Sequence, residues 1–357
     1  SLPDNYVSAS YQDAQGVLWF GTKGGLARFD PVSGRFQRHP LAQPGRSPLR
    51  AVETILPAPD GDLWLATNDG LVRFDPASGH HQAWRHDPGD AASLRDDHVN
   101  AIALDGQGAL WIGTASGVDR LAPDGARFSH FDIAPLARGG RDPARNHVLS
   151  LSMGPRETLW IGTAAGLEAW RLGSGAPQPV ALTPAQRMAD LRIERLYHDS
   201  GSQLWVGTDT GGLKWRDPAS GQFVSYRYSQ YDQHSLSDNQ VMSVLVDRTG
   251  TLWVGTCFGG VSRTDLASGG FARYGTADGL GRAKVRAVHG EPDGHIWIGT
   301  TGDGLLRLDP ATRALERIRD PALPGEVVTA LAFDSRRLWI GTPMGLLWRD
   351  ARGRSGR

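Results

Sequence analysis

Histidine is the side chain in this sequence that is best suited to proton transfer or metal binding near neutral pH. His98 and His147 lie 49 residues apart, and each is followed at once by a valine. If the fold places these two stretches side by side, the imidazoles could form a metal site or an acid and base pair. His80 and His81 are neighbours in the chain, and neighbours in a strand point to opposite faces, so they do not predict a shared metal site.

Other patterns with known chemistry are missing from the sequence. It contains neither G-x-S-x-G nor H-E-x-x-H, which excludes two common hydrolase arrangements. The runs GTKGG and GTDTGG lack the phosphate-loop lysine and the helix that follows it, so they are typical of tight turns. A single cysteine, Cys257, can form neither an internal disulfide nor a thiolate cluster. We therefore predict no catalytic residue, no metal and no cofactor. Four aspartates are expected to bond to the backbone of their own turns, namely Asp30, Asp75, Asp217 and Asp309.

The charge balance excludes several classes of partner. Lys plus Arg and Asp plus Glu both number 38, without a long run of one sign, so neither nucleic acid nor an anionic membrane surface is an expected partner. No stretch approaches the roughly 18 apolar residues of a membrane span, and no signal peptide opens the chain. Because the sequence begins with Ser, we interpret it as a portion of a longer protein.

The elements that position these residues are indicated by a short motif, L-W-x-G-T, which recurs eight times with small changes. Its tryptophans are separated by 42 to 49 residues, the length of one four-stranded propeller blade. A β-branched residue stands twelve positions before each tryptophan, from Val7 in the first repeat to Val327 in the last, and suits a buried extended segment. The motif tryptophans, expected to be structural, are Trp19, Trp64, Trp111, Trp160, Trp205, Trp253, Trp297 and Trp339.

Turns rich in Gly, Asp and Pro divide each repeat into four short segments, and none of these shows helical periodicity. The segments are one that starts at the β-branched residue, the LWxGT motif, one such as GLVRFD, and an outer one after a turn such as DPASG. We predict an all-β fold, a single-domain β-propeller of eight four-stranded antiparallel blades. The repeats span approximately residues 1–45, 46–92, 93–140, 141–187, 188–235, 236–279, 280–322 and 323–350, and residues 351–357 form a basic flexible tail.

Within the motif, alternate side chains face opposite sides of the strand. In LWVGT, Leu204, Val206 and Thr208 share one face, whereas Trp205 and Gly207 share the other. A large indole beside a residue without a side chain allows two blades to approach closely. We therefore predict that the tryptophan fills the layer between blades and that the glycine permits their contact. The alanine of LWLAT, Ala66, adds only a methyl group, which slight local adjustment would accommodate.

The repeat pattern resembles the two-component regulator propeller repeat. The resemblance rests on the recurring order V…D..G.LWIGT..GL.R.D…SG.F and on the linkers SLPDNYV, SLRDDHV and SLSDNQV, and it extends over essentially the whole chain. Propellers of this family are similar to extracytoplasmic sensor regions of bacterial membrane receptors, where they precede a β-sandwich, a membrane span and a histidine kinase or diguanylate cyclase. The resemblance implies a periplasmic input domain that is not itself an enzyme.

Closure of the ring has two possible arrangements. The eighth repeat ends at GLLWRD and the tail ARGRSGR, which shows nothing like an outer strand. Either an outer strand upstream of this chain completes eight blades, or seven blades close and the eighth repeat begins another propeller.

In a propeller, the linkers that enter the first strand and the turns that follow LWxGT emerge on one face. Their lengths vary here, and variation on a regular scaffold is typical of a binding face. We expect the mouth of the central channel on this face to bind a small polar ligand, such as a glycan or peptide. The candidate residues are Asn5, Tyr6, Lys23, Asn68, Asp69, His98, Ser116, Asn146, His147, Arg192, Asp209, Asn239, Gln240, Phe258, Lys284 and Asp303.

Three functions fit this sequence. The favoured one is a non-enzymatic sensor propeller that binds a ligand or forms a homodimer, through the propeller or a downstream module. The second is a propeller lyase of the streptogramin-inactivating type, which would need a histidine with a nearby acid and usually a metal on one face. The third is a protein-interaction scaffold of the WD-repeat kind.

Overall fold

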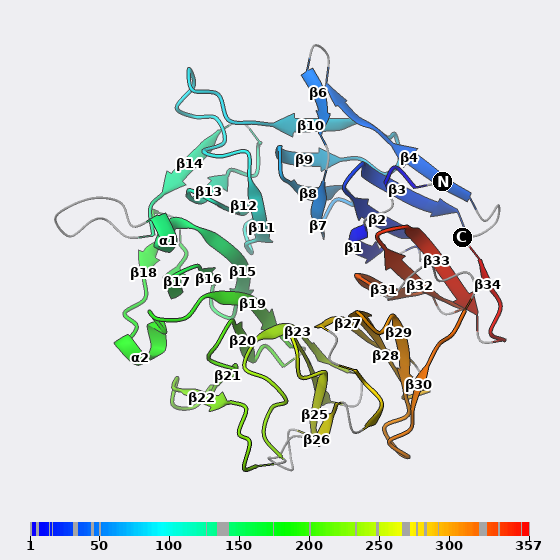
Figure 1. Ribbon diagram of the computed structural model, residues 1–357. Coiled ribbons are helices and arrows are strands. Elements are labelled where there is room, and N and C mark those ends of the chain that lie inside the picture. Colours follow the sequence, from blue (N-terminus) through cyan, green and yellow to red (C-terminus); the bar gives the residue numbers. More distant parts are fainter. Residues whose placement is uncertain are drawn as a thin grey trace.

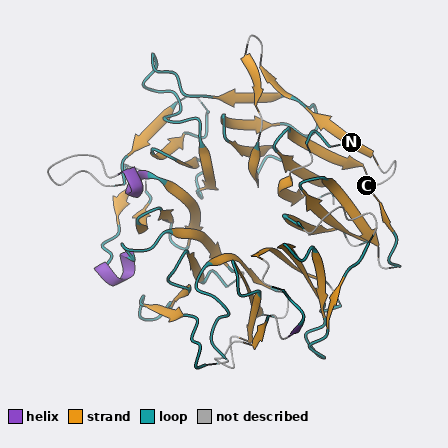
Figure 2. Ribbon diagram, viewed as in Figure 1, coloured by secondary structure: helices purple, strands orange, loops and turns teal. Residues whose placement is uncertain are grey.

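The computed structural model shows a ring of four-stranded antiparallel sheets around a central channel (Figures 1 and 2). It describes residues 2–4, 7–13, 15, 17–30, 35–43, 46–49, 51–125, 127–133, 143–173, 175–199, 201–232, 234–247, 250–265, 272–275, 278–281, 284–291, 293–320, 327–334, 336–350 and 352–356. Eight such sheets follow one another around the ring, so the eight-bladed β-propeller is confirmed and a seven-bladed ring is excluded. We number the blades 1 to 8 in chain order.

Each blade takes four consecutive strands, ordered from the channel outward. The innermost strands are β1 (Val7–Gln12), β7 (Val52–Pro57), β11 (Val99–Leu104), β15 (Val148–Gly154), β19 (Ile193–His198), β23 (Val241–Val246), β27 (Lys284–Gly290) and β31 (Ala330–Phe333). The second strands, which carry LWxGT, are β2 (Leu18–Thr22), β8 (Leu63–Thr67), β12 (Leu110–Thr114), β16 (Thr158–Thr163), β20 (Leu204–Thr208), β24 (Thr251–Thr256), β28 (Ile296–Thr301) and β32 (Arg337–Thr342).

The third strands are β3 (Gly25–Asp30), β9 (Gly70–Phe74), β13 (Gly117–Leu121), β17 (Gly166–Arg171), β21 (Leu213–Arg216), β25 (Val261–Asp265), β29 (Leu305–Leu308) and β33 (Gly345–Asp350). The outer strands are β4 (Arg35–His39), β10 (His81–Trp84), β14 (Phe128–Phe131), β18 (Gln178–Pro179), β22 (Phe223–Tyr226), β26 (Ala272–Tyr274), β30 (Leu315–Arg317) and β34 (Ser355–Gly356). A small extra sheet joins β5 (Leu41–Gln43) to β6 (Arg46–Leu49), and the helices are α1 (Pro143–Asn146) and α2 (Pro184–Arg187). Neither helix has the length and apolarity needed to cross a membrane, and the rest of the described chain contains no helix that does.

The motif tryptophans fill the layers between blades, as the alternation predicts. Trp205 of blade 5 packs with Leu252 and Val254 of blade 6, while Leu204 and Val206 face blade 4. The motif glycine allows the next blade to approach closely. A Cβ built on Gly207 would lie 2.9 Å from a methyl carbon of Val241, the first residue of the next blade's inner strand. The same contact recurs around the ring, so the missing side chain makes room for the neighbouring valine or isoleucine.

The count of twelve residues fails in the last repeat. Val328, not Val327, occupies the seat against the preceding blade's glycine, where a Cβ on Gly299 would lie 2.6 Å from its methyl carbon. The reason is a shorter turn between the first two strands of blade 8. There the aspartate that bonds to the tryptophan stands five residues before it, whereas in blades 1, 3, 5 and 6 it stands six before.

The motif threonine and the turn aspartates also build the scaffold. All eight motif threonines donate their hydroxyl to a glycine carbonyl in the following turn, as Thr22 does to Gly25 at 2.8 Å. Asp75, Asp217 and Asp309 accept from backbone N–H groups of their own turns, which confirms that prediction. The side chain of Asp30 lies outside the described residues.

The SLxD linkers are structural as well. Leu2, Leu94 and Leu236, the second residues of the three linkers, are all buried. Ser93 and Ser235 each accept a backbone N–H six residues back in the chain and so fix the linker before it enters the inner strand. This recurring lead-in therefore docks the chain against the blade.

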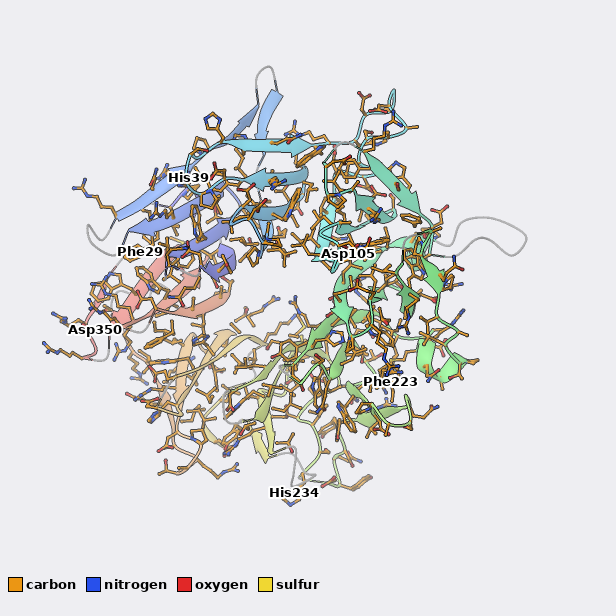
Figure 3. The ribbon with its side chains drawn as sticks, turned by 180° about the vertical axis from the view of Figure 1, so that it is seen from behind. Phe29, His39, Asp105, Phe223, His234 and Asp350 are labelled. Carbon is orange, nitrogen blue, oxygen red and sulfur yellow. The ribbon has the colours of Figure 1, made fainter. Side chains whose placement is uncertain are left out.

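Blade 8 is completed by residues that we expected to form a flexible tail. Within 351–357, β34 pairs with β33 through Trp348 opposite Gly356 and Arg349 opposite Ser355. The ring then closes as every other seam does, with no strand shared between the first and last blades. Trp339 packs against Phe29 of blade 1, with 3.8 Å between ring centroids, where these blades meet (Figure 3). Thr329 Oγ1 donates to the Val7 carbonyl at 2.8 Å across the same seam.

Candidate functional site

The central channel is lined by one recurrent position, the residue after the first β-branched residue of each inner strand. In blades 1 to 7 the pairing of the inner strand shifts register at this residue, as in a β-bulge, and bulges redirect side chains. These side chains surround a cavity of about 500 Å³. We call them the channel ring: Ser8, Glu53, Asn100, Leu149, Glu194, Met242, Arg286 and Thr329.

Three members of the channel ring connect neighbouring blades. Ser8 Oγ donates to the Val52 carbonyl at 2.6 Å, and Asn100 Nδ2 donates to the Val148 carbonyl at 2.8 Å. Thr329 makes the corresponding bond to blade 1. These three side chains are bound to the backbone of the next blade, whereas Glu53, Glu194 and Arg286 are the charged members of the ring.

Two carboxylates of the channel ring are held by residues that the sequence placed at the mouth. Asn68 Nδ2 donates to Glu53 Oε1 at 3.3 Å, and Arg192 Nε donates to Glu194 Oε1 at 2.8 Å. Burial in the channel raises the pKa of Glu53, although the bond from Asn68 acts in the opposite direction. The channel wall therefore presents, in Glu53, a carboxyl group that holds its proton more tightly than an exposed one.

Cations lie in the same channel. Arg195 is open to the channel, yet the surrounding protein desolvates its guanidinium and lowers its pKa, while the carboxylate of Glu194 raises it. Arginine keeps its proton under these conditions. Arg286 also lines the cavity. The channel thus offers fixed positive and negative charge within a few residues, which suits a ligand with several hydrogen-bonding groups.

The histidines singled out from the sequence do lie near one another. Burial lowers the pKa of His147, and the positive charges of Arg192 and His98 lower it further. Asp96 is the only nearby group that raises it. These surroundings keep the imidazole of His147 neutral at about pH 7, which is the form that binds a metal or accepts a proton. Among the described residues, neither His98 nor His147 belongs to a group of three side chains placed to hold a metal ion.

The other predicted residues spread over the mouth face. Asn68 and His98 line the cavity itself. Lys284 Nζ lies 5.0 Å from the ring centroid of Phe258, so these two come together. Asn146 differs from the expectation of an open position, because its side chain is buried and its Oδ1 accepts from Ile133 N at 3.0 Å. Asn5 and Tyr6 lie outside the described residues.

Most remaining candidates are engaged by near neighbours. Asp69 pairs with Arg85 at 2.6 Å, and Asp303 pairs with Arg317 at 2.6 Å. The other engaged side chains are Ser116 with Asp96, Asp209 with the backbone of Arg192, and Asn239 with the backbone of Tyr228. The backbone carbonyl of Gln240 accepts from Cys257 N, and Lys23 does the same for Ala51 N.

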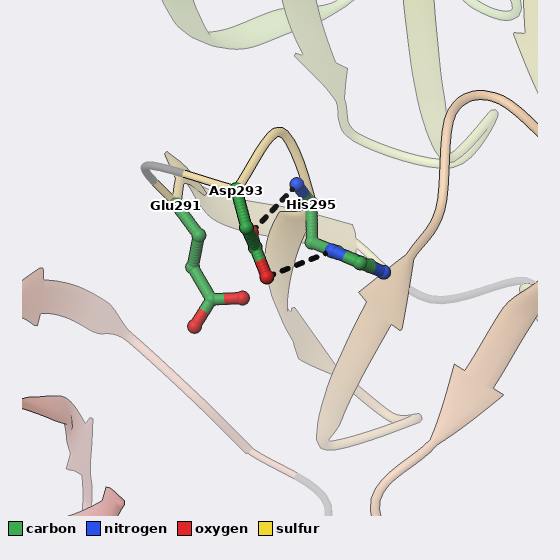
Figure 4. A group of neighbouring side chains, drawn as sticks. All are labelled: Glu291, Asp293 and His295. Atoms are coloured by element: carbon green, nitrogen blue, oxygen red, sulfur yellow. Dashed lines mark hydrogen bonds and ion pairs between the residues drawn. The ribbon is translucent and has the colours of Figure 1, made fainter. Parts of the chain in front are cut away.

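One acidic cluster on another blade has the composition of a metal site. Ligand atoms of Glu291, Asp293 and His295 lie within 4.8 Å of one another (Figure 4). However, the Arg307 guanidinium bonds to Glu291 at 2.9 Å and to Asp293 at 3.0 Å. A cation already neutralises both carboxylates, so this cluster is an ion-pair network.

The residues selected from the sequence precede the β-branched position or follow LWxGT, whereas the channel ring consists of the residues directly after the β-branched position. The available signal was variation: from repeat to repeat this position holds Ser, Glu, Asn, Leu, Met, Arg or Thr, while its neighbour stays Val or Ile.

Three segments match the family described as Two component regulator propeller, at residues 1–24, 93–116 and 235–258. Each begins at an SLxD linker and ends just after LWxGT. These three segments, which lie in blades 1, 3 and 6, are similar to two-component regulator propeller repeats. No curated protein matches the chain.

Solved structures show the same fold at low identity. A chain described as the extracellular domain of the hybrid two component system BT3049 from B. thetaiotaomicron matches with a TM-score of 0.64 and 23% identity, over 98% of this chain and 47% of that one. This chain therefore spans about half the length of that relative. A virginiamycin B lyase from Staphylococcus aureus, crystallised with Quinupristin, matches with a TM-score of 0.56 and 12% identity, over 82% and 92% of the two chains. The Dos1 propeller matches with a TM-score of 0.66 and 11% identity, over 94% of this chain and 89% of that one.

Proposed function

We propose that this regulator propeller is the extracytoplasmic input domain of a bacterial membrane receptor, and that it binds a small polar ligand without transforming it. The single observation that carries the proposal is the channel ring, with one side chain from each blade around one cavity. A ligand in that cavity touches several blades at once, so its binding energy depends on how the blades are placed. That dependence is what a sensor needs in order to couple binding to a change of packing.

The size and chemistry of the channel favour a short oligosaccharide or peptide. A volume of about 500 Å³ lies within the range of small-molecule sites. Glu53, Glu194, Arg195 and Arg286 supply acceptors and donors around it. Hydroxyl-rich or amide-rich ligands can satisfy both kinds, whereas an apolar ligand would leave these charges desolvated and unpaired.

Aromatic rings on the mouth face add a surface for stacking. Phe258 is 59% exposed and Tyr231 is 90% exposed, which is unusual for side chains of this size. Phe258 N bonds to Asp238 and Tyr228 N bonds to Asn239, so two aromatic residues are anchored to consecutive residues of one linker. The ring of Phe258, in the turn after LWVGT, could stack on a sugar ring or a peptide side chain at the channel mouth.

We also propose a route by which the signal leaves the domain. Regulator propeller repeats in a membrane receptor imply an output module outside this chain, and a homodimer formed through the propeller or that module would transmit the change. Support for an extracytoplasmic location comes from the family repeat and from the extracellular domain that shares the fold.

A lyase is the second candidate, because a streptogramin B lyase shares this fold with a TM-score of 0.57 at 15% identity and His98 lines the cavity. Burial and the nearby cations lower the pKa of His147 and so make it a weaker general base. Turnover of a streptogramin by the purified chain, dependent on His98, would favour the lyase over the sensor.

Calorimetric titration tests the sensor proposal directly. The chain is titrated with a panel of oligosaccharides and short peptides, and the ligand that binds is titrated again with Glu194→Gln and Arg195→Gln. Each variant should weaken binding by about tenfold or more, since each removes a charged partner. Glu316→Gln, on the outer strand of blade 7, is the matched control and should bind normally. Equal binding by all four proteins would refute a site in the channel.

A further inference from the structure

A second cavity, of about 400 Å³, lies between blades 4 and 5 on the face opposite the channel mouth. It is formed by the starts of second strands, the ends of third strands, the turns beside them, the segment after the outer strand β18 and the last residue of the inner strand β19, His198. None of its lining residues lines the channel. Its polar lining includes Trp160, Arg156, Arg171, Arg216 and His198, and none of its lining residues is Asp or Glu.

The repeat itself shows what this cavity lacks. In five blades the motif tryptophan donates its indole N–H to an aspartate of the preceding turn; in blade 3, Trp111 Nε1 donates to Asp105 Oδ2 at 2.9 Å. In blade 4 the equivalent residue is Gly154, six positions before Trp160. Within the described part of the chain, no side chain accepts from Trp160 Nε1. The indole donor therefore faces a cavity where other blades have a carboxylate.

The chain could not easily fill this place itself. A Cβ on Gly154 would lie 2.9 Å from His198 Nε2 and 3.0 Å from Trp160 Nε1, closer than ordinary packing allows. His198 is fixed there by a 2.6 Å bond between its Nδ1 and Ser152 Oγ. A molecule that enters the cavity from solvent avoids this crowding, because it does not have to begin at the Cα of Gly154 as a side chain would.

Among the described residues, the arginines that line this cavity form no ion pair, although the Asp217 carboxylate lies near enough for Arg216 to lower its pKa. In blades 2, 3 and 7 the arginine that covers the motif tryptophan pairs with an acid of its own blade, as Arg73 does with Asp62 at 2.6 Å. In blade 4 the residue opposite Trp160 is Ala169, and Arg216 reaches over from blade 5, with 5.3 Å from its guanidinium carbon to the ring centroid. The Nε of Arg216 is buried and has no hydrogen-bond partner in the described structure.

We propose that this cavity binds a small organic carboxylate with a flat, largely apolar body. The ligand's carboxylate takes the place of the missing aspartate, accepts from Trp160 Nε1 and forms an ion pair with the Arg216 guanidinium. Arg156 and Arg171 provide further positive charge at the cavity wall, and Val180 and Leu182 offer an apolar wall for the ligand body. His198 stays neutral, because burial lowers the pKa of its imidazole, so the charge complementarity comes from the arginines.

Benzoate and its uncharged counterpart benzamide are suitable probes for calorimetric titration of the whole chain. Benzoate should bind with saturation, and benzamide should bind at least about tenfold more weakly. Arg216→Gln and Trp160→Phe should each weaken benzoate binding by about tenfold, since each removes one donor. A thermal melt of each variant confirms that it is folded, and Arg216→Gln carries the test alone if Trp160→Phe is unstable.

Arg263→Gln is the matched control. Arg263 covers Trp253 at 5.6 Å in blade 6, where the indole N–H already bonds to Asp247 at 2.8 Å. This variant should bind benzoate as the unaltered chain does. The proposal is overturned if benzamide binds as well as benzoate, if Arg263→Gln weakens binding as much as Arg216→Gln, or if benzoate shows no saturation up to about 10 mM.

Discussion

The seam between blades 3 and 4 and the seam between blades 4 and 5 are built from the same motif and differ in their polar groups. In the first, Trp111 bonds to Asp105 and is covered by Arg120 of its own blade. In the second, Trp160 has no such aspartate and is covered by Arg216 of the next blade. The apolar packing is alike in both, so the difference shows that a blade can lose its polar bond and still seat on its neighbour. In place of that bond, the second seam has a cavity lined by arginines that form no ion pair among the described residues.

The largest expected effect compares the two tryptophans. Trp111→Ala should lower the free energy of unfolding by about 3 to 5 kcal/mol, because a buried indole and its hydrogen bond are both lost. Trp160→Ala should cost less, since its indole already borders a cavity. Denaturant unfolding of both variants measures the difference. Equal losses would mean that the seams are energetically the same.

The motif glycines should behave alike in both seams. A Cβ on Gly113 would lie 2.4 Å from a Val148 methyl carbon, and one on Gly162 would lie 2.7 Å from an Ile193 methyl carbon. We expect Gly113→Ala and Gly162→Ala each to lower the free energy of unfolding by about 1 to 3 kcal/mol, because overpacking forces the blades apart. Gly173→Ala, with open space around the new Cβ, is the control and should be neutral in the same denaturation experiment.

Removing the polar bond from the first seam should have a smaller effect. Asp105 accepts from Gln107 N, Ala109 N and Trp111 Nε1. Asp105→Ala should therefore lower the free energy of unfolding by about 1 to 2 kcal/mol, and Asp105→Asn should fall between it and the unaltered chain. Thermal melts would contradict this if Asp105→Ala melted as the unaltered chain does.

The smallest effect concerns pH. His198 stands in the second seam, where the corresponding residue of the first seam is Met153. Burial lowers the pKa of His198, so the folded state favours the neutral imidazole. Its contribution is present above the unfolded pKa and is lost as the pH falls through both values. From about pH 7.5 to 5, the unaltered chain should lose more stability than His198→Gln, by less than about 1 kcal/mol. An identical decline in denaturant midpoints would contradict this.

The fold was predictable because it depends on residues that repeat. Trp205 and Gly207 alternate in the strand, and that alternation sufficed to predict which face meets the next blade. The position of Val328 was not predictable from spacing, because one residue fewer in a turn shifts the count without changing the motif. β34 was missed for a related reason, since a strand of two residues carries no periodicity.

The channel ring was less predictable, because it depends on backbone geometry that no residue type indicates. A bulge turns Glu53 and Glu194 into the channel, and the sequence around them reads as an ordinary alternating strand. In the sequence, the cavity beside Trp160 is indicated only by the lack of an aspartate six residues before this tryptophan. Gly154 is the sequence signal for it, and its meaning became clear once Trp111 was seen to bond to Asp105.

The seam between blades 8 and 1 differs from every other seam in one topological respect. The other seven are crossed by the chain itself, whereas the contacts across this one within the described residues are made by side chains, with Trp339 against Phe29 and Thr329 against the Val7 carbonyl. The two ends of the described chain lie near this seam (Figure 1). The ring therefore does not depend on which blade comes first in the sequence. A circular permutant, with its old ends joined and new ends opened at another linker, retains all eight blades and moves the uncrossed seam elsewhere.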